Sequence, residues 1–148
     1  MGKRLRATAD LVAAAWAARR RAYAPYSRFP VGAAVRTRGG AIYGACNVEN
    51  ASYGLSCCAE RNAVYAAVAA GDREIEAVAI VAGTDGPVAP CGACRQVLSE
   101  FNPAMRVIMV SRRGAVRTMR LDRLLAYSFR GGSLKTKNRN KRRARCSE

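Results

Sequence analysis

Residues 78–101, VAIVAGTDGPVAPCGACRQVLSEF, hold in one stretch the signals that decide the fold of this chain. Residues 78–82 are uniformly apolar, as is typical of a short strand buried on both faces. Residues 83–90 are rich in turn-forming residues and predict a loop. Residues 91–101 predict a helix, which Asn102 and Pro103 end. A buried strand that leads into a helix is a unit of a sheet covered by helices.

The flanking segments extend this pattern in both directions. Further helices are predicted over residues 7–22, 56–70 and 122–127. Further strands are predicted over residues 31–38, 41–45, 107–110 and 115–118. The first two strands are joined at Gly39 and Gly40, which is a hairpin signal. This order predicts an α/β fold of three layers, α/β/α, with a five-stranded mixed sheet in the middle.

The composition indicates one globular domain followed by a basic tail. The chain has 148 residues, half of them apolar, which is enough to bury a core. Basic residues outnumber acidic ones by 26 to 10, and seven basic residues lie within residues 135–148. We therefore expect a domain over residues 1–134 and a disordered tail over residues 135–148. Nucleic-acid binding by the tail is not favoured, because it has no aromatic residue to stack on a base.

Two absences narrow the function further. No apolar run approaches the roughly 20 residues that span a bilayer, so we expect a cytoplasmic protein without membrane contact. The sequence also contains no histidine. This excludes Ser-His and Cys-His catalysis and every histidine-ligated metal. Any catalysis must therefore use other side chains, or a metal held by sulfur and oxygen.

The cysteines predict such a metal. Cys91 and Cys94 lie on the first turn of a predicted helix, where residues three apart face the same way and thiolates are favoured. Cys58 stands at the start of another predicted helix. A structural zinc site needs four protein ligands, and there is no second Cys-x-x-Cys pair. Three thiolates with an open fourth position therefore predict catalytic zinc. The spacing leaves open a register in which Cys57 is the ligand.

Glu60 and Arg61 follow the expected ligand directly. Glu60 lies two residues beyond Cys58, within reach of a water on the metal, and is the expected proton carrier. The alternative is that Glu60 only complements the positive end of its helix. Arg61 is expected to offset the charge of the thiolates, and the alternative is a surface arginine.

At these residues the sequence resembles the cytidine deaminase family. Cys58-Ala59-Glu60 and Pro90-Cys91-Gly92-Ala93-Cys94 match the three-cysteine form of the zinc-deaminase motif. The resemblance also includes residues 25–34, 47–53 and 94–96, and it covers about residues 7–134. The three-cysteine form is typical of the small homotetrameric members that act on free nucleosides. The resemblance therefore implies a cytidine deaminase-like zinc domain that works as a homotetramer.

The resemblance also implies how a nucleoside is bound. Phe29 would pack against the pyrimidine, and backbone groups at Ala59 would hold the base. Asn47 and Glu49 would bind the ribose, with Glu49 on the 3′-hydroxyl. The residues expected to complete the pocket of a neighbouring subunit are Ala51, Tyr53 and Phe129. One departure falls here, since family members often have Ser-Phe-Gly-Pro where this chain has residues 128–131, Ser-Phe-Arg-Gly.

The reaction that this implies is hydrolytic deamination of cytidine and 2′-deoxycytidine to uridine and 2′-deoxyuridine, with release of ammonia, in pyrimidine salvage. Water activated by zinc attacks C4, and Glu60 moves protons from the water to N3 and to the leaving amino group. Three alternatives remain from the sequence. They are deamination of cytosine in a polynucleotide, deamination of a nucleoside analogue, and a non-catalytic zinc module that binds nucleic acid.

Overall fold

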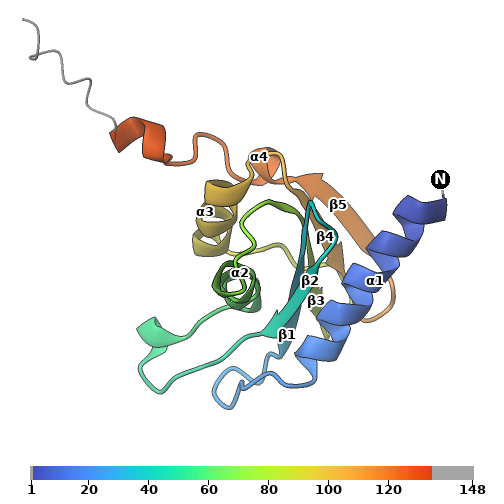
Figure 1. Ribbon diagram of the computed structural model, residues 1–148. Coiled ribbons are helices and arrows are strands. Elements are labelled where there is room, and N and C mark those ends of the chain that lie inside the picture. Colours follow the sequence, from blue (N-terminus) through green and yellow to red (C-terminus); the bar gives the residue numbers. More distant parts are fainter. Residues whose placement is uncertain (1, 135–148) are drawn as a thin grey trace, which may run out of the picture.

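A five-stranded mixed sheet forms the middle of the structure, which is a computed structural model that describes residues 2–134 (Figure 1). The strand order is β2-β1-β3-β4-β5. The strands are β1 (Val31–Thr37), β2 (Ile42–Cys46), β3 (Ile75–Ala82), β4 (Arg106–Val110) and β5 (Val116–Arg120). Only β3 and β4 are parallel to each other, and the other neighbouring pairs are antiparallel. The predicted five-stranded mixed sheet is therefore confirmed.

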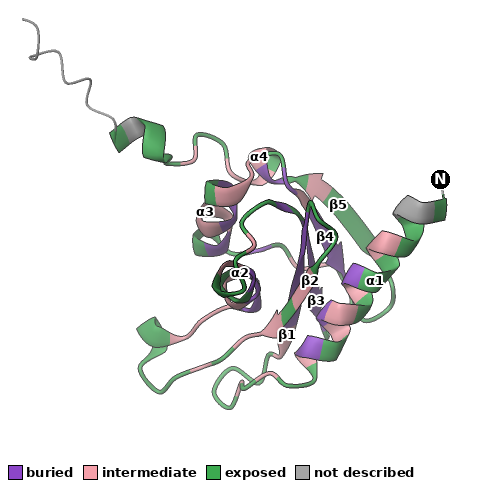
Figure 2. Ribbon diagram, in the orientation of Figure 1, coloured by how far each residue is buried: buried purple, intermediate pink, exposed green. Residues whose placement is uncertain are grey.

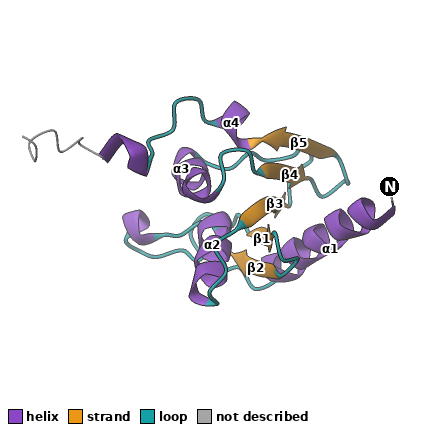
Figure 3. Ribbon diagram, turned by 45° about the horizontal axis from the view of Figure 1, so that its top comes forward, coloured by secondary structure: helices purple, strands orange, loops and turns teal. Residues whose placement is uncertain are grey.

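Helices cover both faces of this sheet (Figure 3). The helices are α1 (Gly2–Arg19), α2 (Ala59–Ala69), α3 (Gly92–Phe101) and α4 (Leu121–Leu124), with 3-10 turns at Tyr53–Leu55 and Gly131–Leu134. On one face, Leu11 and Ala15 of α1 pack against apolar side chains of β1, β3 and β4. On the other face, α2, α3 and α4 pack against the alternate residues of the same strands. The three layers predicted from the sequence are present.

The core has this two-sided arrangement because the central strands carry apolar residues on both of their faces. Six of the seven residues of β1 are buried, and seven of the eight residues of β3 are buried (Figure 2). Strand β5 lies at the edge and is mostly exposed. Small residues let α1 approach the sheet closely. A Cβ added at Gly32 would lie 2.1 Å from the carbonyl oxygen of Ala15.

Several element boundaries differ from the prediction, and each difference has a local cause. The helix predicted from residue 56 begins only at Ala59, because Cys57 forms backbone hydrogen bonds with Val48 in both directions. The strand predicted from residue 78 begins at Ile75, because Ile75 already pairs with Thr37. The helix predicted to residue 127 ends at Leu124. Further on, Tyr127 has a φ of 52°, which a right-handed helix excludes.

The remaining predictions of extent concern α1 and the tail. The first helix was expected over residues 7–22, but α1 begins at Gly2 and ends at Arg19. Tyr23 instead donates its backbone N–H to Asn47, which draws the chain away from the helix axis. The tail predicted over residues 135–148 lies outside the described residues. Between residues 2 and 134, no helix combines the length and the apolar character that crossing a membrane requires.

Candidate metal centre and adjoining cavity

Two helix starts bring three cysteines together. Cys58 is the N-cap residue of α2, and Cys91 is the N-cap residue of α3, both with extended backbone. Cys94 is the third residue of α3 and is buried. Each helix start directs unpaired backbone N–H groups and a partial positive charge toward these sulfurs. The chain therefore gathers the three thiols at a point that favours negative charge.

The separations of the sulfurs fit a zinc ion. Cys58 Sγ lies 3.9 Å from Cys91 Sγ, and Cys91 Sγ lies 3.5 Å from Cys94 Sγ. All three ligand atoms lie within 4.8 Å of one another. Zinc–sulfur bonds of about 2.3 Å at tetrahedral angles place their sulfurs roughly 3.8 Å apart. No other group of three such side chains within residues 2–134 meets this criterion. These cysteines would hold the zinc and leave one coordination position open.

The surroundings also shift the pKa values of two of the three thiols. A hydrogen bond from the Cys94 thiol, with further help from Arg61 and Cys91, lowers the pKa of Cys58 to about 5. The same hydrogen bond and burial raise the pKa of Cys94. One sulfur of the three is therefore a thiolate at neutral pH before any metal binds. Because zinc binds the thiolate form, this asymmetry lowers the cost of the first zinc–sulfur bond.

Glu60 is the second residue of α2 and lies beside the three sulfurs. It is only 5% exposed. Burial raises the pKa of its carboxyl, and the negative charge of Cys58 adds to the rise. A raised pKa makes the carboxyl a stronger proton acceptor than a free glutamate, which suits general acid–base catalysis. A glutamate that only complemented the positive end of its helix could do so from the surface, so the burial of Glu60 favours the acid–base interpretation.

Arg61 connects the metal centre to the preceding loop. Its Nη2 donates to the carbonyl oxygen of Ser56 at 3.1 Å and lies 3.8 Å from Cys58 Sγ. Its Nε is buried and has no partner within the described residues. The guanidinium therefore faces the thiolate and partly offsets its charge. Arg61 therefore lies beside Cys58, close enough for the charge compensation expected from the sequence.

A cavity of about 390 Å³ opens next to these residues. Its wall includes Cys58, Ala59, Glu60 and Cys91 from the two helix starts. The opposite wall comes from the loop before β1 and the loop after β2, with Ser27, Phe29, Asn47 and Glu49. The remaining lining residues are Val31, Ile80, Val88 and Ala89. The cavity thus brings two of the three clustered cysteines, the buried carboxyl of Glu60, an aromatic ring and a second carboxylate to one space.

Phe29 and Asn47 form one side of this cavity. Phe29 is 41% exposed, so much of its ring faces open space and not the core. The Asn47 side chain holds this segment from the next loop. Its Nδ2 donates to the carbonyl oxygen of Phe29 at 3.1 Å, and its Oδ1 accepts from the N–H of Val31 at 2.8 Å. Asn47 therefore fixes the position of the aromatic ring.

Glu49 forms the rim of the cavity. Its Oε2 accepts the backbone N–H groups of Tyr26 at 2.9 Å and Ser27 at 3.1 Å, and its Oε1 accepts the hydroxyl of Ser27. The hydrogen bond from Ser27 is the main reason that the pKa of Glu49 is lowered. Glu49 is thus an ionised hydrogen-bond acceptor at neutral pH.

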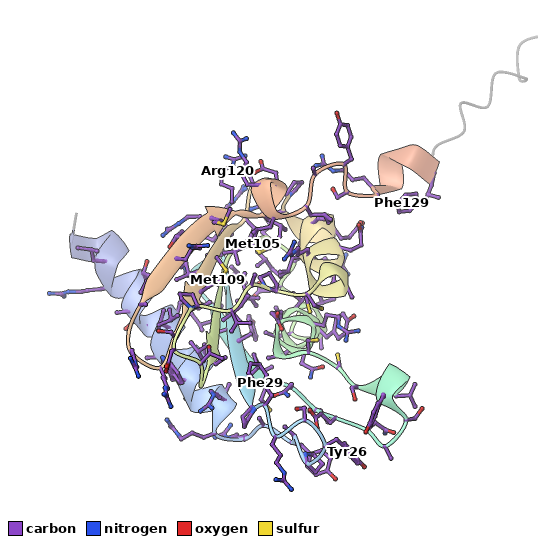
Figure 4. All side chains as sticks on the ribbon, turned by 180° about the vertical axis from the view of Figure 1, so that it is seen from behind. Tyr26, Phe29, Met105, Met109, Arg120 and Phe129 are labelled. Atoms are coloured by element: carbon purple, nitrogen blue, oxygen red, sulfur yellow. The ribbon has the colours of Figure 1, made fainter. Side chains whose placement is uncertain are left out.

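The three residues expected to serve a neighbouring subunit lie outside this cavity. Ala51, Tyr53 and Phe129 are exposed, with 75% of Tyr53 and 59% of Phe129 accessible. None of them lines the 390 Å³ space. In Figure 4, Phe129 lies on the projecting C-terminal segment, away from Phe29. The segment around Tyr53 also projects away from the sheet in Figure 1.

The two other cysteines within residues 2–134 lie on a separate surface. Cys46 and Cys57 both line a different cavity of about 480 Å³, and neither belongs to the three-sulfur group. Burial raises the pKa of Cys57, so this thiol stays protonated at neutral pH. The register in which Cys57 is the metal ligand is disfavoured by this arrangement. Cys146 lies outside the described residues.

Three positioning residues were not identified from the sequence. Ser27 binds Glu49, and Asn62 Nδ2 donates to the carbonyl oxygen of Cys46 at 2.9 Å. Arg95 donates to the carbonyl oxygens of Pro90 and Leu124, at 2.7 and 2.8 Å, and so holds the loop that carries Cys91. Ser27 and Arg95 fall inside the stretches that carry the resemblance, which was the one signal available. Ser27 contacts a side chain 22 residues away and Arg95 contacts a backbone carbonyl 29 residues away, which no local pattern reveals.

Comparisons with known proteins agree with this site. A sequence model described as the cytidine and deoxycytidylate deaminase zinc-binding region matches residues 6–111. The cytidine deaminase of Sporosarcina psychrophila is 48% identical over 120 residues, which cover 80% of this chain and 88% of that protein. The cytidine deaminase of Mycobacterium tuberculosis strain H37Rv is 44% identical over 108 residues, which cover 73% of this chain and 78% of that protein.

Solved structures give the same result for the fold. The crystal structure of cytidine deaminase from Burkholderia pseudomallei matches with a TM-score of 0.79 and 52% identity, over 81% of this chain and 97% of that one. The cytidine deaminase from Mycobacterium leprae matches with a TM-score of 0.67 and 43% identity, over 79% of this chain and 95% of that one. Both the sequence similarity and the structural similarity extend over most of the part of the chain that carries the cavity.

Proposed function

This chain belongs to the cytidine and deoxycytidylate deaminase family, and from that premise we propose that it deaminates cytidine and 2′-deoxycytidine by hydrolysis. The products are uridine or 2′-deoxyuridine and ammonia, and the metabolic role is pyrimidine salvage. The observation that carries this function is the placement of three sulfurs at zinc-binding distances beside the buried carboxyl of Glu60, with Cys58, Cys91 and Glu60 lining a 390 Å³ cavity. We assign the activity to residues 1–134.

The zinc ligands in this proposal are Cys58, Cys91 and Cys94. Zinc bound by three thiolates with an open position lowers the pKa of water to about 7 and so supplies a nucleophile at neutral pH. The sulfur separations of 3.9 and 3.5 Å support this ligand set. Arg61 stabilises the charge of the ligand set through its contact with Cys58.

Glu60 carries the protons of the reaction. It accepts a proton from the water that attacks C4 of the cytosine base. It donates this proton to N3, takes up the second proton from the hydroxyl now bonded to C4, and passes it to the amino group as the C4–N bond breaks and ammonia leaves. Its burial and its position two residues beyond Cys58 support this role, because a carboxyl shielded from solvent water keeps its proton for the substrate.

The remaining cavity residues orient the nucleoside. Phe29 packs against the pyrimidine ring, and the backbone of Ala59 holds the base next to Glu60. Glu49 accepts a hydrogen bond from the 3′-hydroxyl of the ribose, and the amide of Asn47 contacts the same sugar. The support is that all four residues line the same cavity as Glu60 and Cys58. Glu49 is the one ionised acceptor on the rim away from the metal.

We also propose that the working form is a homotetramer in the cytoplasm. Ala51, Tyr53 and Phe129 then complete the cavity of an adjacent copy. Their high exposure and their absence from the cavity of their own chain support this assignment. A reducing compartment is supported by the site itself, because three free thiolates are needed to hold the metal.

The decisive experiment measures zinc content and cytidine turnover on the same sample. We expect one zinc per chain, release of ammonia from cytidine, loss of activity with a chelator and its return with added zinc. A Cys91→Ala variant loses the zinc, whereas the matched Cys57→Ala variant keeps it. A zinc-loaded protein that leaves cytidine unchanged would refute the function. Turnover of a single-stranded oligonucleotide in preference to cytidine would favour a polynucleotide deaminase, which the charge of +16 otherwise suggests.

A further inference from the structure

Ser27 stands between the two groups that orient the nucleoside in the proposed function. It lines the 390 Å³ cavity with Phe29 and Glu49. It also lines a neighbouring cavity of about 330 Å³, where Glu49 lies with the tyrosines Tyr26 and Tyr53. Ser27 therefore lines both of the cavities that Glu49 lines. It belongs to neither the metal centre nor the proton path.

The hydroxyl of Ser27 has two bonds of opposite direction. It donates to Oε1 of Glu49, and it accepts the backbone N–H of Phe29 at 3.0 Å. The chain between them passes through Arg28, which has a φ of 52°. This left-handed conformation, which is uncommon for a residue other than glycine, reverses the chain and brings the N–H of Phe29 back to Ser27. One hydroxyl thus connects the backbone of Phe29 to the carboxylate of Glu49.

The hydrogen bonds that Glu49 already accepts leave one acceptor position of its carboxylate for the substrate. A carboxylate has about four acceptor positions on its two oxygens. Oε2 accepts two backbone N–H groups, and Oε1 accepts the Ser27 hydroxyl. One acceptor position therefore remains, on Oε1, and the Ser27 hydroxyl fixes its direction. This hydrogen bond is also the main cause of the lowered pKa of Glu49, so it favours the ionised carboxylate.

We propose that Ser27 is a positioning residue that aims the remaining acceptor of Glu49 at the 3′-hydroxyl of the nucleoside. Ser27 thereby determines how strongly the enzyme prefers a substrate with that hydroxyl. The proposal rests on the proposed function of the cavity. It assigns to Ser27 an effect on sugar recognition, and not on the metal or on proton transfer.

Recognition of the base does not depend on the same hydroxyl. Phe29 has a second anchor in Asn47, which binds the carbonyl oxygen of Phe29 and the N–H of Val31. Both bonds persist when Ser27 loses its hydroxyl. The backbone N–H groups of Tyr26 and Ser27 also continue to hold Oε2 of Glu49. Truncation of Ser27 therefore frees the orientation of Oε1 and leaves the loop in place.

The test compares cytidine with 3′-deoxycytidine in a Ser27→Ala variant of the zinc-loaded full chain. We expect kcat/KM for cytidine to fall roughly tenfold, mainly through a higher KM, as for the loss of one well-oriented hydrogen bond. For 3′-deoxycytidine, kcat/KM changes less than about twofold, since that substrate does not use Oε1. Ser27→Thr keeps a hydroxyl and restores the discrimination. Ser111→Ala is the matched control, because its buried hydroxyl accepts the N–H of Ala115 away from the cavity.

Two further measurements separate positioning from structure. In a Glu49→Gln background, Ser27→Ala adds no further loss if Ser27 acts through Glu49, which a double-mutant cycle shows directly. Calorimetry should find that Ser27→Ala weakens the binding of uridine but not that of 3′-deoxyuridine. Equal losses on both nucleosides, or additive losses in the cycle, would overturn the proposal. Failure of the proposed function looks different, because the unaltered protein then turns over neither nucleoside.

Discussion

At the scale of single residues, Cys58 and Glu60 share one helix start but have opposite tasks. Cys58 is the N-cap, and hydrogen bonds from Cys94, Arg61 and Cys91 lower the pKa of its thiol to about 5. Glu60 lies one residue further into the helix than Ala59, where burial raises the pKa of its carboxyl. The sulfur is therefore prepared to bind a cation, and the carboxyl is prepared to carry a proton. The pKa values of two neighbouring groups on one helix start are thus shifted in opposite directions.

Glu60→Gln tests this division at the residue itself. The amide keeps the shape of the side chain but cannot move a proton, so we expect kcat on cytidine to fall about 10²- to 10⁴-fold. Zinc per chain should stay unchanged, because Glu60 is not a ligand. The same exchange at the exposed Glu100 of α3 is the control and should leave kcat as it was. Near-normal turnover in the Glu60 variant would remove Glu60 from the mechanism.

At the scale of elements, the site depends on how closely the helices approach the sheet. Strand β1 carries the loop with Phe29 at its start, and α1 packs against the same strand end. A Cβ at Gly32 would lie 2.1 Å from the carbonyl oxygen of Ala15 and 2.7 Å from Cβ of Arg19. Arg19 in turn donates from Nε to the carbonyl oxygen of Pro30 at 2.9 Å. Helix α1 therefore sets the position of the segment that leads into the cavity.

Gly32→Ala should push α1 away from β1. We expect a loss of about 1–3 kcal/mol in the free energy of unfolding, as for overpacking of a filled core. Gly39→Ala is the matched control in the β1–β2 turn, where the nearest atom to a new Cβ is Thr37 Oγ1 at 3.8 Å. It should change the stability by less than about 0.5 kcal/mol. Urea unfolding of the two variants measures the difference, and equal midpoints would show that α1 can move without cost.

At the scale of the whole molecule, the described chain carries apolar groups that its own fold does not use. Tyr53 and Leu55 are 75% and 71% exposed, and Phe129 and Leu134 are 59% and 70% exposed. They lie on two separate segments that project from the body of the structure (Figure 1). Exposed apolar groups of this kind mark surfaces that meet a partner. A homotetramer in which each copy completes the cavity of another accounts for both segments.

Subunit mixing tests this arrangement. Phe129→Ala should lower the activity in cytidine deamination while each chain keeps its own zinc and Glu60. Glu60→Ala chains are inactive but retain Phe129. When the two are co-expressed with different tags, the purified hybrid should be more active than either variant alone, since an intact Phe129 then meets an intact Glu60. Hybrids without any recovery of activity, or a protein whose mass in solution equals the 15.9 kDa of one chain, would contradict the shared cavity.

Local patterns in the sequence determined the chemistry of this protein. The absence of histidine, the spacing of Cys91 and Cys94 at a helix start, and Glu60 two residues after Cys58 predicted the metal, the open position and the proton carrier. They also predicted the order of the elements, because apolar runs and turn residues report on the chain within a few positions. These signals act over single turns of helix or single strands, and so they can be read without the fold.

The tertiary structure decided which of these groups meet and where the elements end. Cys57 is tied to Val48, a contact across the fold that moves the start of α2 to Ala59 and makes Cys58 the N-cap. Ser27 reaches Glu49 over 22 residues, and Arg95 reaches Leu124 over 29 residues. Such contacts depend on which segments the strand order brings together. The Arg95 contact is also with a backbone carbonyl, a group that every residue possesses, so residue type does not predict it. For that reason local patterns predicted the metal ligands, and only the fold brings Phe29, Asn47 and Glu49 into one cavity with Cys58 and Glu60.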